Sequence, residues 1–340
     1  MLNQNQLGIY DMTILELLEI KHPIFLAPMA GVSTPELAAE VSNQGALGSL
    51  GLGANTPSAA KELILKTQAL TEKPFQVNFF CHQSESLNPD IAQQWIEYIA
   101  PHFEKFGITP PTQLNCIYPS FLDNDDFLNI ILETQPKAVS FHFGIPHPHQ
   151  IKALKDAGII TMVSATNLIE AQQIEAAGID LIIAQGIEAG GHRGIFNQHF
   201  DAAIKTLDLV QLISKHCTIP EIAAGGIMNG EQAKQMLKAG ASAVQLGTAF
   251  VQCKSSSANA AYRKALFNQN ITQIIINDNQ EINLKLSGLN TFIELGHNNK
   301  LEKKIQNLKA FYNRAVRKND IEKYKEVNLQ FENQVVAVKK

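Results

Sequence analysis

The chain has 340 residues, of which 45% are hydrophobic, enough for a substantial core in one large domain or two modest ones. Its 28 Lys and Arg against 32 Asp and Glu give a net charge of −4, which provides no field to recruit nucleic acid or an anionic membrane. Four scattered cysteines form no Cys-x-x-Cys pair, and no apolar stretch reaches the length of a membrane span. We therefore expect a cytoplasmic protein with reduced thiols, no bound metal and a small-molecule partner.

Short apolar runs alternate with helical patterns along the first three quarters of the chain. After an amphipathic opening segment at 13–19, the strands are predicted at 23–27, 46–50, 75–80, 138–143, 160–164, 181–184, 222–224 and 243–246. Helices are predicted at 36–45, from 57 onward, and at 148–157, 167–177, 202–216 and 231–239, several of them closed by glycine. The connection at about 81–137 is longer and contains helical stretches at 91–106 and 127–133, which predicts a helical insertion after the third strand.

Eight repeated βα units predict an α/β protein with a parallel sheet, and eight is the number that closes a (β/α)8 TIM barrel. A doubly wound open sheet is the alternative, and no Gly-x-Gly-x-x-Gly element follows the first strand to support a dinucleotide-binding version. The alternation stops near residue 255. We predict a barrel domain at 1–254 and a smaller C-terminal segment at 255–340 that packs on it, with a β-rich piece at 272–286 and a charged helix at 300–317.

In such a barrel the residues that follow each strand converge at one end, where the active site lies. The loop after the sixth strand combines Gln185, His192 and Arg193 with four glycines, and an amide, an imidazole and a fixed cation suit a planar, partly anionic molecule. Phosphate groups commonly bind after the seventh and eighth strands. Here those strands end in Gly225-Gly226 and Gly247-Thr248, whose N–H groups and hydroxyl can hold a phosphate.

Six segments, in this order, give the sequence a resemblance to the class I nitronate monooxygenases, once called 2-nitropropane dioxygenases. They are Ala27-Pro28-Met29-Ala30-Gly31-Val32, Val77-Asn78-Phe79-Phe80, Ser140-Phe141-His142-Phe143-Gly144, Gln185-Gly186 with Glu188-Ala189-Gly190-Gly191-His192-Arg193-Gly194, Ala223-Ala224-Gly225-Gly226-Ile227, and Gln245-Leu246-Gly247-Thr248. Each glycine pair alone is common, but the ordered set is specific.

The resemblance implies an FMN-dependent barrel enzyme that oxidises alkyl nitronates, of the propionate 3-nitronate type, with O2 to a carbonyl compound and nitrite or nitrate. It implies that His192 and His142 are catalytic and face the substrate over the flavin ring, with the phosphate at the last two loops. The implied cofactor-binding residues are Ala27, Met29, Asn78, Ser164, Gln185, Gly190, Gly191, Gly225, Gly226, Gln245, Leu246, Gly247 and Thr248.

The C-terminal part departs from this family pattern. Leu289 to Phe292 stand where an Arg-rich segment is expected, and 330–334 stand where a Trp-Ala-Gly-Gln-like element is expected. Two alternatives stay open: an FMN- and NAD(P)H-dependent enoyl-acyl-carrier-protein reductase, and a non-catalytic barrel that binds FMN or another phosphorylated ligand. A hydrolase has little support because no Gly-x-Ser-x-Gly element is present, and His147-Pro148-His149 is interpreted as a helix start. Both a monomer and a homodimer are compatible with the sequence.

Overall fold

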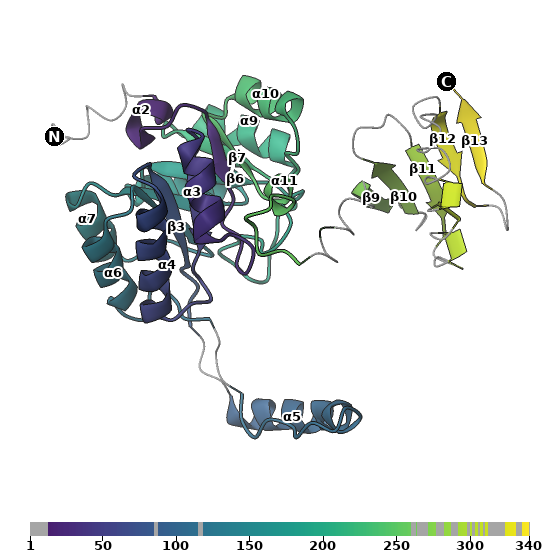
Figure 1. Cartoon of the computed structure of the whole chain (residues 1–340), viewed down its shortest axis with the longest axis horizontal. Coiled ribbons are helices and arrows are strands. Elements are labelled where there is room, and N and C mark those ends of the chain that lie inside the picture. Colours follow the sequence, from purple (N-terminus) through teal and green to yellow (C-terminus); the bar gives the residue numbers. More distant parts are fainter. Residues whose placement is uncertain are drawn as a thin grey trace. The chain divides into compact units, whose positions relative to one another are not determined.

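The computed structural model describes residues 13–84, 88–114 and 118–259, and in the C-terminal part residue 263 and the segments 271–276, 282–286, 292–297, 300, 303–304, 307–308, 310–311, 324–330 and 335–339. It divides into two compact units, Met1–Ala258 and Asn259–Lys340 (Figure 1). Each unit is described by itself below. No helix in the described part of the chain combines the length and apolar character needed to cross a bilayer.

The first unit is a closed barrel of eight parallel strands. From β2 to β8 each strand pairs with the next, β8 pairs with β1 through Phe25 and Gln245, and an isolated bridge between Phe25 and Leu47, just before β2, joins the two ends of the sheet. The predicted (β/α)8 barrel is therefore confirmed, and the open doubly wound sheet is excluded. The strands are β1 (Ile24–Leu26), β2 (Gly48–Gly51), β3 (Phe75–Phe80), β4 (Ala138–His142), β5 (Ile160–Ala165), β6 (Leu181–Gln185), β7 (Glu221–Ala224) and β8 (Ala243–Leu246).

A barrel helix follows each strand, and capping side chains stabilise the first turn of several of these helices. Thr34, Thr56, Asn167 and Asn229 each accept a hydrogen bond from a backbone N–H in the first turn of the helix that they precede. In order from β1 to β8, the helices are α3 (Pro35–Asn43), α4 (Pro57–Leu70), α6 (Asp126–Thr134), α7 (Pro148–Asp156), α8 (Leu168–Ala176), α9 (Thr206–His216), α10 (Gly230–Ala239) and α11 (Thr248–Val251).

Three details differ from the sequence-based expectations. The helix α6 packs against α4 and α7 and so is the regular barrel helix after β3, which leaves α5 (Pro89–Glu104) as the additional helix. The helix α9 begins at Thr206, four residues later than predicted, because the Glu188 carboxylate accepts hydrogen bonds from the Thr206 N–H and hydroxyl at 2.8 and 2.9 Å. The short helix α11 was not predicted, because a single turn has no periodicity to detect.

The barrel interior is apolar at one end and polar at the other. At the amino ends of the strands, Ile14 and Leu18 of α2 (Ile14–Leu18) belong to one buried cluster with Leu181 and Ile222. Alternate residues of a strand share a face, so the same interior column continues with polar side chains toward the carboxyl ends. These buried polar residues are Ser49, Gln76, Asn78, Ser140, Ser164, Gln185 and Gln245.

Glu221, the first residue of β7, is a buried carboxyl group whose ionisation opposes folding. Burial raises its pKa to about 7, and its Oε1 atom has no hydrogen-bond partner among the described residues. The folded state therefore holds its proton more tightly than the unfolded chain, whose pKa is near 4.5, and stability is lost as pH rises from 4.5 to 7.

We expect Glu221→Gln to unfold less readily than the parent protein above neutral pH, because a neutral amide of similar size needs no ionisation. At about 1.4 kcal/mol for each pH unit in that window, the gain is about 3 kcal/mol at pH 8 and below about 1 kcal/mol at pH 5. Urea denaturation of both proteins at the two pH values measures it. A gain that is equal at both pH values would contradict the raised pKa.

The second unit is a five-stranded sheet in the order β13-β12-β11-β10-β9. It includes the predicted β-rich piece, and its buried core contains Ile293, Leu308 and Val327. Of the predicted helix at 300–317, the described residues Leu308 and Phe311 are helical. The divergent segments 289–291 and 331–334 lie outside the described residues. The strands are β9 (Ile271–Ile276), β10 (Ile282–Leu286), β11 (Phe292–Gly296), β12 (Tyr324–Asn328) and β13 (Val336–Lys339).

Candidate active site

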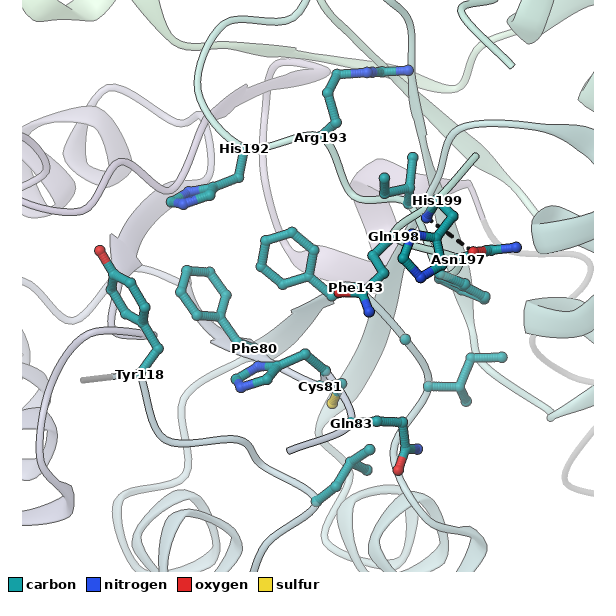
Figure 2. Close-up of a pocket in the computed structure, with 16 residues that line it drawn as sticks. Phe80, Cys81, Gln83, Tyr118, Phe143, His192, Arg193, Asn197, Gln198 and His199 are labelled. Atoms are coloured by element: carbon teal, nitrogen blue, oxygen red, sulfur yellow. Dashed lines mark hydrogen bonds between the residues drawn. The ribbon is translucent and has the colours of Figure 1, made fainter. Parts of the chain in front are cut away.

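Arg193 holds the glycine-rich loop after β6 together. Its Nη1 donates to the backbone oxygens of Gln185 and Gly186 at 2.9 and 2.6 Å, and its Nε and Nη2 donate to the Asp201 carboxylate at 2.8 and 3.1 Å. The same guanidinium holds the pKa of Asp201 below its usual range. In Figure 2 the Arg193 side chain points away from the His192 ring. The Arg193 charge is thus paired with Asp201 inside the protein, while the side chain also lines the cavity beside His192, and its use as a cation for an anionic ligand stays a prediction.

Gln185, at the end of β6, binds the same loop from inside the barrel. Its Nε2 donates to the His192 backbone oxygen at 2.9 Å, and its Oε1 accepts from the Gly194 N–H at 2.7 Å and from Arg193 at 3.2 Å. Gly194 lies so close to the barrel that an added Cβ would approach the His142 ring to 2.8 Å. Only glycine can occupy position 194 this close to the His142 ring. The loop is therefore held in a defined position over the carboxyl ends of the strands.

His142, the last residue of β4, uses both ring nitrogens within the protein. Its Nε2 lies 3.0 Å from the His192 backbone oxygen, and its Nδ1 lies 2.9 Å from the Ser164 hydroxyl. A carbonyl oxygen can only accept, so Nε2 carries the proton and Nδ1 accepts from Ser164. Burial lowers the pKa of His142 to about 4, so the ring is neutral near pH 7. His142 therefore positions the His192 backbone, together with Gln185.

The His192 ring lies at the wall of a cavity of about 940 Å³. The rings of Phe80, Tyr118 and Phe143 surround it edge-on, with centroids 5.5, 6.3 and 5.6 Å away (Figure 2). Among the residues that the structure describes, neither ring nitrogen of His192 has a hydrogen-bond partner. Unlike His142, His192 can offer a ring nitrogen to a bound molecule.

Two aromatic residues of this cavity have features that sequence reasoning did not use. Phe143 adopts φ of +72°, a left-handed conformation that costs a non-glycine residue about 1–2 kcal/mol and is most frequent at functional sites. Tyr118 belongs to the long connection after β3, follows no predicted strand and was missed as a site residue. Its sequence neighbourhood carries no glycine pair or strand end that could have indicated it. Only the folded barrel brings its ring to His192.

The predicted cofactor residues lie at the carboxyl ends of their strands, in two groups. After β1 and β8, a Cβ on Gly247 would lie 3.6 Å from both Ala27 and Met29, and the Ala27 N–H donates to the Leu246 oxygen at 2.8 Å. Gly225 and Gly226 follow β7 with positive φ, Thr248 begins α11, and Gly190, Gly191, Gly226 and Thr248 are exposed.

The second group forms the polar column inside the barrel. Asn78 donates to the backbone and side-chain oxygens of Ser140 at 3.2 and 3.0 Å. Ser164 contacts His142, and Gln185 contacts the His192 loop, as described above. Gln245 is buried and lies near Gln76. None of the predicted cofactor residues lines the cavity beside His192, so that cavity is adjacent to the proposed cofactor contacts and distinct from them.

Comparison with known proteins places the chain among enzymes. A family model described as nitronate monooxygenase matches residues 12–328. The chain is 50% identical over 284 residues to a nitronate monooxygenase of Paraburkholderia phytofirmans, covering 83% of this chain and 78% of the relative. It is 51% identical over 251 residues to a nitronate monooxygenase of Pseudomonas aeruginosa, covering 74% and 72%.

Solved protein structures are also similar to this chain. A nitroalkane oxidase from Streptomyces ansochromogenes superimposes with a TM-score of 0.68 at 36% identity, covering 76% of this chain and 74% of that one. FabK from Thermotoga maritima superimposes with a TM-score of 0.60 at 31% identity, covering 78% and 71%.

Proposed function

The chain belongs to the nitronate monooxygenase family, and from that premise we propose that it uses FMN to oxidise an alkyl nitronate of the propionate 3-nitronate type with O2. The products are a carbonyl compound and nitrite or nitrate. It is a flavin-dependent oxidoreductase with a small-molecule substrate. The observation that best supports the nitronate as substrate is the His192 ring, which has both nitrogens available at the wall of an aromatic cavity. A nitronate is already an anion, so it needs a hydrogen-bond donor more than a strong base.

The residues present fit a bound flavin nucleotide. Exposed glycine backbone follows both β6 and β7, and a Cβ on Gly190 would meet no atom within 4 Å, so a planar ligand can approach this backbone. We propose that Gly225, Gly226, Gly247 and Thr248 hold the phosphate through N–H groups and the Thr248 hydroxyl. The remaining proposed FMN contacts are Ala27, Met29, Asn78, Ser164, Gln185, Gly190, Gly191, Gln245 and Leu246.

When bound, FMN supplies the electron acceptor for the nitronate and the electron donor for O2. In our proposal, His192 donates a hydrogen bond from a ring nitrogen to a nitronate oxygen and so fixes the anion in the cavity. His142 and Gln185 both donate a hydrogen bond to the His192 backbone oxygen, at 3.0 and 2.9 Å. In this way they position the His192 ring in the cavity. Phe80, Tyr118 and Phe143 form an aromatic wall beside this contact.

Two further proposals rest on the sequence. Reduced cysteines support a cytoplasmic location, and Cys81, Cys217 and Cys253 are unpaired thiols in the structure. Residues 255–340 are proposed to shape the substrate side of the enzyme, because the corresponding segments do so in the family that the sequence resembles.

Anaerobic mixing separates the proposed activity from the reductase alternative. Purified protein is mixed with propionate 3-nitronate or with NADH, and the visible flavin absorbance is followed. Loss of absorbance with the nitronate alone supports the monooxygenase. Loss with NADH alone would favour the enoyl reductase, retained colour with both would favour a non-catalytic flavin-binding barrel, and absence of a flavin band would overturn the cofactor proposal.

Substitution of Gly190 by alanine tests where the flavin lies. The added methyl group meets no protein atom, so the thermal stability of the apoprotein should not change. If FMN lies against this backbone, the methyl group should raise the Kd for FMN at least about tenfold, which corresponds to 1.4 kcal/mol. Gly230→Ala is the matched control, because a Cβ there also meets no atom within 4 Å and the position lies in α10. Equal FMN affinity in the two variants would exclude Gly190 from the cofactor site.

A further inference from the structure

Two buried polar side chains in the barrel interior each have an oxygen atom without a hydrogen-bond partner among the described residues. Gln76 on β3 and Ser49 on β2 are both 0% exposed, and they are register partners in neighbouring strands. The Gln76 Oε1 and the Ser49 Oγ have no hydrogen-bond partner among the described residues. A buried polar atom without a partner destabilises the folded state, so an apolar side chain would suit the fold better at either position. A role other than stability must account for Gln76.

Gln76 makes one polar side-chain contact, and it is directed at a proposed cofactor residue. Its Nε2 lies 3.5 Å from the Oε1 of Gln245 on β8, at the limit of hydrogen-bond distance. A glutamine amide presents an oxygen at one end and a nitrogen at the other, and its neighbours decide which end faces a ligand. Because Gln76 donates to the Gln245 oxygen, the Gln245 nitrogen is the end left to donate elsewhere.

We propose that Gln76 is a positioning residue for the flavin, acting through the Gln245 amide. With its oxygen held by Gln76, Gln245 presents N–H groups to the acceptor atoms of the flavin ring system, which carries carbonyl oxygens and unprotonated ring nitrogens. A reversed amide would present an oxygen to the same acceptors and would repel them. This proposal rests on the proposed FMN site and adds to it a residue that has no direct contact with the cofactor.

Gln76→Met tests the proposal, because methionine has the length of glutamine without its polar atoms. We expect the apoprotein to melt at the same or a higher temperature, since an unsatisfied buried oxygen is removed. We also expect the Kd for FMN, measured by quenching of flavin fluorescence on titration, to rise about tenfold and the visible flavin bands to shift. Gln76→Asn keeps the amide but is one methylene shorter, and it should show the same change in the Kd for FMN. It is the test variant if Gln76→Met does not fold.

Gln150→Met is the matched control. Gln150 on α7 is also buried, but its Nε2 donates to the Phe121 oxygen and to Asp125, both at 3.0 Å, and its Oε1 accepts from the His147 N–H. This variant should therefore melt at a lower temperature and bind FMN as the parent protein does. Gln76→Met is thus expected to weaken FMN binding without loss of stability, and Gln150→Met to lower stability without loss of FMN binding.

A double-variant cycle with Gln245→Met decides whether Gln76 acts through Gln245. If it does, adding Gln76→Met to Gln245→Met causes no further loss of FMN affinity. Additive losses, or an unchanged Kd and spectrum in Gln76→Met, would overturn the proposal while leaving the FMN site intact. Absence of FMN binding by the parent protein would instead overturn the proposed cofactor and this inference with it.

Discussion

Replacing His192 by alanine is expected to leave a folded, flavin-containing protein whose kcat/KM for nitronate oxidation falls about 100-fold. The reason is that alanine removes the ring nitrogen proposed to hold the nitronate oxygen, and one such donor in an active site is typically worth about that factor. The backbone oxygen of His192, which accepts from His142 and Gln185, is unaffected by the change. Steady-state oxidation of propionate 3-nitronate, normalised to bound flavin, measures the effect.

The exposed His22 provides the control for this prediction. Its side chain is at the amino end of β1, outside the candidate site, and His22→Ala should leave the rate unchanged. His192→Gln keeps an N–H donor on a side chain of different shape and is expected to retain more activity than His192→Ala. Equal turnover per flavin in His192→Ala and the parent protein would remove His192 from the substrate site.

Arg193→Met is expected to unfold about 3 kcal/mol more easily than the parent protein and to lose most of its flavin. Methionine fills part of the volume but leaves the Gln185 and Gly186 oxygens without their donor and Asp201 without its counter-ion. These contacts anchor the loop that contains Gly190, Gly191 and His192. Loss of the guanidinium should therefore weaken the binding of cofactor and substrate together. Chemical denaturation and the ratio of flavin to protein absorbance measure the two effects.

Asp201→Asn separates the ion pair from the backbone contacts. The amide keeps an oxygen for Arg193 and leaves the donations to Gln185 and Gly186 in place, so we expect a loss of about 1 kcal/mol and normal flavin content. If Arg193→Met is as mild as Asp201→Asn, the guanidinium does not hold the loop. If Asp201→Asn is as severe, the charge pair rather than the carbonyl contacts anchors it.

The barrel itself could be predicted from local signals. Thr34-Pro35 and Thr56-Pro57 each start a helix, because a capping hydroxyl and a fixed φ act within one turn. Short apolar runs such as 75–80 and 160–165 form strands because both of their faces are buried in a parallel sheet. Eight such units in a row determine the closed barrel and, through it, the end at which the loops converge.

The roles of individual side chains depended on partners that are remote in sequence. The sequence indicated Arg193 and His142 as groups for a ligand. In the structure, Arg193 binds Asp201 and two carbonyl oxygens. The ring nitrogens of His142 bind the Ser164 hydroxyl and the His192 backbone oxygen. Tyr118 reaches the site from a connection without any regular pattern. Local sequence determines backbone conformation through interactions a few residues apart, whereas the direction and occupancy of a polar side chain are decided by whichever groups the closed barrel brings within hydrogen-bond distance.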